Sequence, residues 1–214
     1  MERIRFRSML PEVFKTAIMS ESDIWRNDVT FERNHTYLIE AESGKGKSTF
    51  CSYIMGYRND YEGELLFDDV NIRCYRKKDW VMFRTRAISH LFQELRLFPE
   101  LTAFENVEIK NKLTKHKTKE EILTWFEELG IPNKVNTRIS RMSFGQQQRV
   151  AMMRALAQPF QFLLVDEPIS HLDDDNSRVM GSLMQREVQK QGAGLIVTSI
   201  GKHFDLEYDN ILKL

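Results

Sequence analysis

The chain has 214 residues, and its 31 lysines and arginines balance 31 aspartates and glutamates. Apolar residues make up 42% and aromatic residues 11% of the composition, which is enough for a hydrophobic core and excludes a disordered chain. The zero net charge argues against a general basic surface, so we expect no nucleic-acid partner. The length suits one domain, or a core with a small subdomain.

Cysteine usage and the lack of long apolar runs bear on the compartment. Cys51 and Cys74 are too few for a disulfide framework and lack the spacing of a metal site, which favours a reducing compartment. The first twenty residues hold no apolar run of the length that a secretory signal needs. No stretch of about eighteen apolar residues occurs either. We therefore expect a cytoplasmic protein that does not itself cross a membrane.

In chain order, short apolar runs alternate with helical patterns, which predicts an α/β fold with a mainly parallel sheet. The expected strands are residues 4–7, 37–41, 64–67, 87–92, 162–165 and 195–198. The expected helices are residues 47–57, 119–129, 146–156 and 176–190. The strands at 4–7 and 64–67 are predicted to form a smaller antiparallel element.

The helix expected over residues 119–129 carries its own start and stop signals. Thr118 and Glu121 have the spacing of a capping box, and Gly130 followed by Pro132 ends the helical pattern. The basic stretch at residues 110–119, KNKLTKHKTK, predicts a solvated surface loop rather than a nucleic-acid site.

A glycine-rich segment, AESGKGKST at residues 41–49, follows a predicted strand and opens a predicted helix. Glycines let backbone N–H groups converge on phosphates, and the helix N-terminus favours negative charge. Lys47 would reach the β- and γ-phosphates, and the Ser48 hydroxyl would bind Mg²⁺. Ala41 replaces the first glycine of the motif, so the turn is made with a Cβ present. The expected nucleotide-binding residues of this loop are Ser43, Gly44, Lys45, Gly46, Lys47, Ser48 and Thr49.

Residues 162–167, FLLVDE, form a hydrophobic strand that ends in two carboxylates. Asp166 would reach the Mg²⁺ ion at the carboxyl end of the sheet, where doubly wound folds bind ligands. Glu167 would be the general base for the attacking water. Strand-end acids can be simple helix caps, and a glycine-rich turn can simply start a helix. The two motifs together predict a nucleoside-triphosphate site.

Residues 142–149, MSFGQQQR, resemble the signature motif of the ATP-binding cassette family, which is usually LSGGQ. Ser143, Gly145 and Gln146 match that motif, whereas Phe144 departs from it. The resemblance extends over essentially the whole chain. It implies that these four residues lie at a helix N-terminus and contact the γ-phosphate of ATP held by the opposite subunit.

Other segments fall in the order that the cassette family has. Gln93 matches the glutamine that binds near Mg²⁺ and reports to the transmembrane partner, and residues 97–107 resemble the start of the helical subdomain. Ser170 and Asp173 match the loop that crosses the dimer interface. Phe14 lies where the family often has an aromatic residue that stacks on adenine.

One position departs from the family in a way that bears on catalysis. Cassettes usually have a histidine after the strand at 195–198, where it contacts the γ-phosphate, but this chain has Ser199. A serine is shorter and carries no charge, which implies slow or partner-dependent hydrolysis. His203 would reach the same place only if a helix began at Ser199. Glu167 still favours hydrolysis.

The resemblance implies an α/β P-loop NTPase fold of the cassette type, with a mainly parallel core sheet, an N-terminal antiparallel β element and a helical subdomain. We expect one domain over residues 1–214, with its core at 1–92 and 146–214 and its helical subdomain at about 93–145. The implied cofactors are ATP and Mg²⁺. The implied partners are a second cassette subunit, in a homo- or heterodimer, and transmembrane permease subunits at the inner face of the cytoplasmic membrane. These would dock near residues 93–101.

The segment FPELTAFENV most resembles lipoprotein-releasing, macrolide-exporting and cell-division-associated cassettes, which favours cell-envelope substrates. The main hypothesis is an ATPase subunit that drives a transporter. The alternative is a nucleotide-gated signalling cassette with slow or no hydrolysis because of Ser199. A chromosome-type ATPase would need a long coiled coil between Gln93 and Ser143, and 143 − 93 = 50 positions hold no sustained heptads.

Overall fold

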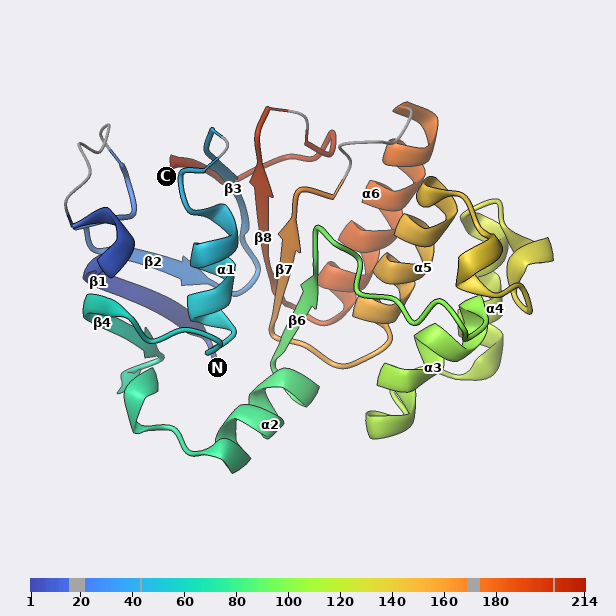
Figure 1. The fold of residues 1–214 in the computed structure, drawn as a ribbon, viewed down its shortest axis with the longest axis horizontal. Coiled ribbons are helices and arrows are strands. Elements are labelled where there is room, and N and C mark those ends of the chain that lie inside the picture. Colours follow the sequence, from blue (N-terminus) through green and yellow to red (C-terminus); the bar gives the residue numbers. More distant parts are fainter. Residues whose placement is uncertain (16–21, 43, 169–173, 202) are drawn as a thin grey trace.

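The computed structural model describes residues 1–15, 22–42, 44–168, 174–201 and 203–214. It has two sheets (Figure 1): a four-stranded antiparallel sheet of order β2-β1-β4-β5 and a five-stranded sheet of order β6-β7-β8-β3-β9. All strand pairs in the larger sheet are parallel. The predicted fold class, a mainly parallel core sheet with an antiparallel β element, is confirmed.

The larger sheet is built from short, mostly apolar strands. These are β3 (Thr36–Glu40), β6 (Ile88–Leu91), β7 (Phe162–Asp166), β8 (Gly194–Ser199) and β9 (Asn210–Lys213). Strands β7 and β8 are buried along their whole length, as expected where helices cover both faces of a parallel sheet. The four strands expected here are present. Strand β9 was not predicted, because its residues are mostly exposed at the sheet edge.

Successive side chains of the sheet alternate between two hydrophobic cores, one on each face. On β7, Leu163 and Val165 belong to the core packed against the helices α3, α4, α5 and α6, whereas Phe162 and Leu164 belong to the other core. The helices are α1 (Lys47–Ile54), α2 (Lys77–Arg86), α3 (Ala103–Thr114), α4 (Lys119–Glu128), α5 (Phe144–Leu156) and α6 (Asp174–Lys190).

The second core joins α1 and α2 to the antiparallel sheet, which consists of β1 (Arg3–Pro11), β2 (Val29–Glu32), β4 (Tyr61–Phe67) and β5 (Val70–Asn71). Aromatic rings hold this junction. Phe6 of β1 stacks on Phe50 of α1 with ring centroids 5.1 Å apart, and Phe31 meets the same ring edge-on at 5.7 Å. The antiparallel sheet therefore fixes α1, and with it the loop that precedes α1.

The loop prediction for residues 110–119 is wrong in part. Helix α3 continues to Thr114, and Lys115 ends it in the left-handed conformation (φ 52°). The Lys117 side chain is only 7% exposed, and its Nζ lies 2.7 Å from the carboxylate of Glu187, which is 1% exposed. Lys117 in this basic stretch therefore pairs with the buried Glu187 and is not part of a solvated surface.

The capping box predicted for α4 is confirmed. The Thr118 hydroxyl accepts a hydrogen bond from the Glu121 backbone N–H (3.2 Å), and the Glu121 carboxylate accepts one from the Thr118 N–H (2.8 Å). Gly130 follows the helix with φ +68°, the conformation in which glycine is favoured. Across the described part of the chain, no helix combines the length and apolar character needed to span a bilayer.

Candidate nucleotide-binding site

The glycine-rich loop lies between β3 and α1, as predicted, at the carboxyl edge of the parallel sheet (Figure 1). Gly44 (φ +81°) and Gly46 (φ +100°) adopt backbone conformations that other residues avoid. A Cβ on Gly46 would also lie 2.8 Å from the ring of Phe14. Ala41 has no such conformation, and its N–H donates to the Ser199 carbonyl (3.1 Å), so the missing first glycine is tolerated. Ser43 lies outside the described residues.

Lys47 is the first residue of α1, and its ammonium group turns back into the loop. It donates to the carbonyl oxygens of Ala41 and Glu42, both at 3.0 Å. It also lies 3.2 Å from the carboxylate of Glu167. Because the side chains of Lys47 and Glu167 are only 5% and 10% exposed, little water screens this ion pair.

Asp166 ends β7 opposite Ser48 and Thr198. The Ser48 hydroxyl donates to one carboxylate oxygen at 3.3 Å, and the Thr198 hydroxyl donates to the other. Burial raises the pKa of Asp166, and these two hydrogen bonds oppose that shift. A hydroxyl and a carboxylate oxygen side by side are the hard donors that Mg²⁺ prefers, so the residues present fit this ion.

Glu167 leaves the sheet through a left-handed turn (φ 47°), which costs about 1–2 kcal/mol for a residue with a Cβ. Its N–H donates to the Thr198 carbonyl at 3.2 Å. Its carboxylate accepts a hydrogen bond from the Gln93 amide at 2.8 Å, on the oxygen that does not face Lys47. We call Lys47, Ser48, Gln93, Asp166 and Glu167 the strand-end cluster.

Phe14 lies beside this loop, in the short helix Glu12–Phe14, with its ring centroid 6.4 Å from that of Trp25. The ring is half-buried and packs against Gly46. The residue predicted to stack on adenine is thus next to the phosphate-binding loop, although it also packs in the core.

The signature residues form the N-terminus of α5. The Ser143 hydroxyl accepts from the Gln146 N–H (3.4 Å), and the Gln146 side chain accepts from the Ser143 N–H (3.1 Å), which makes a capping box. Phe144 is 46% exposed, and Gly145 follows it in the first turn. In Figure 1 strands β7 and β8 lie between this end of α5 and the glycine-rich loop. The structure therefore does not bring the signature residues into the strand-end cluster of the same chain.

The condition under which His203 would reach the switch position, a helix that begins at Ser199, is not met. Strand β8 runs through Ser199, and the described residues between it and β9 form bends and irregular segments rather than a helix. The ring of His203 packs on Tyr208, and one ring nitrogen lies 3.0 Å from the Phe204 carbonyl. The Ser199 side chain is fully buried and accepts a hydrogen bond from the Gly201 N–H (2.9 Å). Ser170 and Asp173, the predicted interface residues, lie outside the described part of the chain.

A cavity of about 640 Å³ runs along the glycine-rich loop. Glu42 and Lys45 line it from the loop, and Ile200 and Gly201 line it from the segment that follows β8. Sequence reasoning missed one residue of the site, Thr198. Its role depends on the parallel register that pairs Thr198 with Asp166, which no local motif reports.

This combination of a lysine-bearing glycine loop, a helix N-terminus and an acidic strand end defines a P-loop nucleotide-binding protein. The profile of the ABC transporter family matches residues 26–170. The chain belongs to that family, and it is an ATP-binding subunit of the ABC transporter type.

Two curated relatives match over most of their own length. The chain is 30% identical over 185 residues to the ABC transporter ATP-binding protein YtrE of Bacillus subtilis, covering 82% of this chain and 80% of that protein. It is 32% identical over 195 residues to the lipoprotein-releasing system ATP-binding protein LolD 2 of Chlorobaculum tepidum, covering 87% and 79%. It also resembles the dimeric structure of MJ0796, a bacterial ABC transporter cassette, with a TM-score of 0.78 and 25% identity over 92% of this chain and 88% of that one.

Proposed function

We propose that this chain hydrolyses ATP as part of a head-to-tail dimer and drives separate permease subunits at the cytoplasmic face of the membrane. The observation that carries this proposal is the position of Glu167. Its carboxylate lies beside Asp166 and contacts both Lys47 and Gln93, so that it can accept a proton at the place where the phosphates and Mg²⁺ would meet.

The glycine-rich loop, Phe14 and the strand-end cluster would each have a distinct part in this reaction. The N–H groups from Gly44 to Thr49, with Lys45 and Lys47, would hold the phosphates, and Phe14 would stack on the adenine. Ser48, Asp166 and Gln93 would hold Mg²⁺, which polarises the phosphoryl oxygens when bound. Glu167 would take the proton of the attacking water, while the Gln93 amide keeps the carboxylate in place.

A dimer would complete the site. Strands β7 and β8 separate the N-terminus of α5, which carries the signature residues Ser143 to Gln146, from the chain's own glycine-rich loop. This helix N-terminus is suited to the γ-phosphate of a partner's ATP. The MJ0796 cassette, which shares this fold, is dimeric. Ser170 and Asp173 would cross the same interface. ATP would then act as a bridging ligand that favours the closed dimer until hydrolysis releases it.

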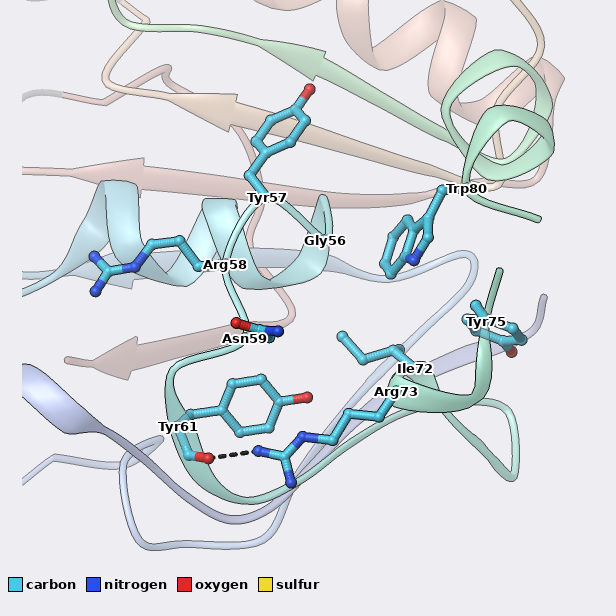
Figure 2. Close-up of a pocket in the computed structure, with 9 residues that line it drawn as sticks. All are labelled: Gly56, Tyr57, Arg58, Asn59, Tyr61, Ile72, Arg73, Tyr75 and Trp80. Carbon is cyan, nitrogen blue, oxygen red and sulfur yellow. Dashed lines mark hydrogen bonds between the residues drawn. The ribbon is translucent and has the colours of Figure 1, made fainter. Parts of the chain in front are cut away.

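Two adjoining cavities offer a route from a permease to Asp166. A cavity of about 480 Å³ lies between the end of α1 and α2, walled by Tyr61, Trp80 and the side chain of Arg73, which donates to the Tyr61 carbonyl (Figure 2). Tyr57 lines both this cavity and a smaller one of about 100 Å³ that reaches Gln93 and Asp166.

We propose that a short permease helix docks over the larger of these two cavities and over residues 93–101. Phe98, 48% exposed, would provide an apolar contact there. The single cassette domain would comprise a core at 1–92 and 146–214 and a helical subdomain at about 93–145 that moves with the permease.

The resemblance to lipoprotein-releasing cassettes supports an envelope substrate, yet relatives of similar identity are named for glutamine transport and glucose import. The shared motifs thus specify the ATP-driven part and not the cargo. Ser199 at the switch position favours a second candidate function, a signalling cassette in which ATP gates an interaction and hydrolysis is slow.

The experiment that tests the proposal is steady-state Mg-ATP turnover against protein concentration, with Glu167→Gln as the blank. Turnover that rises faster than linearly, and is absent from the blank, supports a self-dimerising ATPase. Turnover at the level of the blank at every concentration, with and without permease-containing membranes, would contradict hydrolysis and leave the signalling role as the better account.

A further inference from the structure

Three side chains converge beside the strand-end cluster from elements far apart in the sequence. Sγ of Cys51, a ring nitrogen of His90 and a carboxylate oxygen of Asp166 all lie within 4.8 Å of one another. The register explains why. His90 of β6 pairs with Leu164 of β7, and Asp166 lies two residues beyond Leu164, so all three residues point to the same face of the sheet. Helix α1 covers that face and contributes Cys51.

His90 is the unusual member of this group. Both of its ring nitrogens are buried without a hydrogen-bond partner among the described residues. A polar group left in this state costs about 1–3 kcal/mol. Burial, with help from the charges of Arg96 and Lys110, lowers the pKa of His90 to about 3. A neutral imidazole carries a free lone pair, and this is the form in which it binds metals.

Two members of the group are reachable from the nucleotide side. His90 and Asp166 line the cavity of about 100 Å³ that also holds Ser48 and Gln93. That volume accommodates an ion with a water molecule. Cys51 is 1% exposed and, unlike the exposed Cys74, is shielded from bulk solvent.

We propose that Cys51, His90 and Asp166 form a binding site for a thiophilic divalent cation of the Zn²⁺ class. Zn²⁺ favours sulfur, imidazole and carboxylate donors in a tetrahedral site. The three side chains would supply three of its ligands, and a water molecule or the Ser48 hydroxyl would supply the fourth. Bonds of about 2.0–2.3 Å require the three donors to move together by about 1 Å. Cys51 binds as the thiolate, and its proton leaves to solvent. Mg²⁺ prefers oxygen donors, so this set discriminates against it.

Because Asp166 belongs both to this site and to the proposed Mg²⁺ site, occupation of one should affect the other. A cation held by Cys51 and His90 would withdraw Asp166 from Ser48 and so compete with Mg²⁺ at the adjacent position. ATP turnover would then fall as Zn²⁺ is added. This inhibition rests on the function proposed above, whereas binding of the cation does not.

Binding is tested on the full, nucleotide-free chain with Co²⁺, a spectroscopic probe for Zn²⁺ sites. We expect a thiolate-to-cobalt charge-transfer band that saturates at one equivalent and is removed by Zn²⁺. Cys51→Ala should abolish the band, and His90→Phe should weaken binding by about 100-fold or more. Cys74→Ala, which removes the other thiol, should leave the band unchanged. If His90→Phe fails to fold, as judged by thermal melting, the two cysteine variants decide.

The site is refuted if the unmodified chain shows no thiolate band, if the band survives Cys51→Ala, or if it is lost in Cys74→Ala. A chain that binds Co²⁺ as described but hydrolyses no ATP would refute the proposed function alone. A chain whose turnover is normal and which lacks the band would refute this site alone.

Discussion

The strand-end cluster and the N-terminus of α5 both present polar groups near the carboxyl edge of the sheet, but they satisfy those groups differently. In the cluster, Lys47 and Asp166 are buried, Glu167 is nearly so, and each contacts other members of the cluster. At α5, the Ser143 and Gln146 side chains bond only across their own capping box among the contacts described here, and Phe144 beside them is largely exposed.

The difference indicates which part of the site a single chain can complete. The cluster is preorganised because its charges are already held by neighbours, as catalytic groups need to be. The start of α5 is a helix N-terminus with a favourable dipole, and Ser143 and Phe144 are exposed there. Substitutions in the strand-end cluster should therefore affect the ATP bound to the same chain. Substitutions at the N-terminus of α5 should affect the ATP bound to a partner chain.

The largest effect is expected from the cluster. Glu167→Gln removes the proposed general base while keeping a side chain of the same size, so turnover should fall by about 10²–10⁴-fold with ATP binding retained. Turnover and equilibrium binding of a fluorescent ATP analogue measure the two separately. Glu207→Gln, which neutralises an exposed carboxylate, is the matched control and should change neither. Equal loss of binding and turnover in Glu167→Gln would show that this carboxylate positions the loop instead.

The second prediction tests whether the two regions act in different chains. Lys47→Ala and Ser143→Ala should each reduce turnover by about 10²–10³-fold. In a mixed head-to-tail dimer, one site carries both substitutions and the other carries neither. Mixing the two inactive variants should therefore restore a substantial fraction of the activity.

The control for this mixture is each variant alone at the same total concentration. No recovery in a mixture whose subunits are shown to exchange would mean that Ser143 acts on the ATP of its own chain, which contradicts the proposal that it acts on a partner's ATP.

Much of this comparison was predictable from the sequence, because the P-loop, the acidic strand and the signature segment are contiguous motifs. The core strands were also predictable, since β7 and β8 are unbroken apolar runs. Helix α2 was missed because only Phe83 of its residues is buried, so it has no apolar periodicity. Helix α3 was missed because the buried Asn106 and Asn111 interrupt its apolar face.

The parts of the site that escaped prediction depend on contacts between strands. Thr198 meets Asp166 through a parallel register, and His90 meets Cys51 because α1 packs on β7, the strand that pairs with β6. Cysteine spacing along the chain therefore gave no sign of a metal site. Such neighbours are set by the sheet as a whole and not by any local sequence pattern.

The third prediction concerns Ser199, which the sequence resemblance assigns to the switch position of the family. Ser199→His should raise turnover by about tenfold or more, because one added contact to the transition state is worth up to about 10²–10³. Ser199→Ala, which removes the hydroxyl without adding a donor, should give no increase. Unchanged turnover in Ser199→His, with normal thermal stability, would show that this position does not limit the reaction.

The smallest effect should come from Thr198, which supports the cluster from β8. Thr198→Val leaves one buried oxygen of Asp166 without its donor, which should lower the free energy of unfolding by about 1–2 kcal/mol at neutral pH. Thr198→Ser keeps the hydroxyl and should lower it less. Burial raises the pKa of Asp166, so its ionised form costs stability above that pKa, and the Thr198 bond offsets part of the cost.

Protonation of Asp166 removes most of the advantage of that bond. The difference between Thr198→Val and Thr198→Ser should therefore be largest at neutral pH and should shrink as the pH falls through the pKa of Asp166. Urea unfolding of both variants across this range measures it. A difference that stays constant with pH would mean that Thr198 acts only by packing. The Thr198 hydroxyl of β8 would then not stabilise the ionised carboxylate of Asp166.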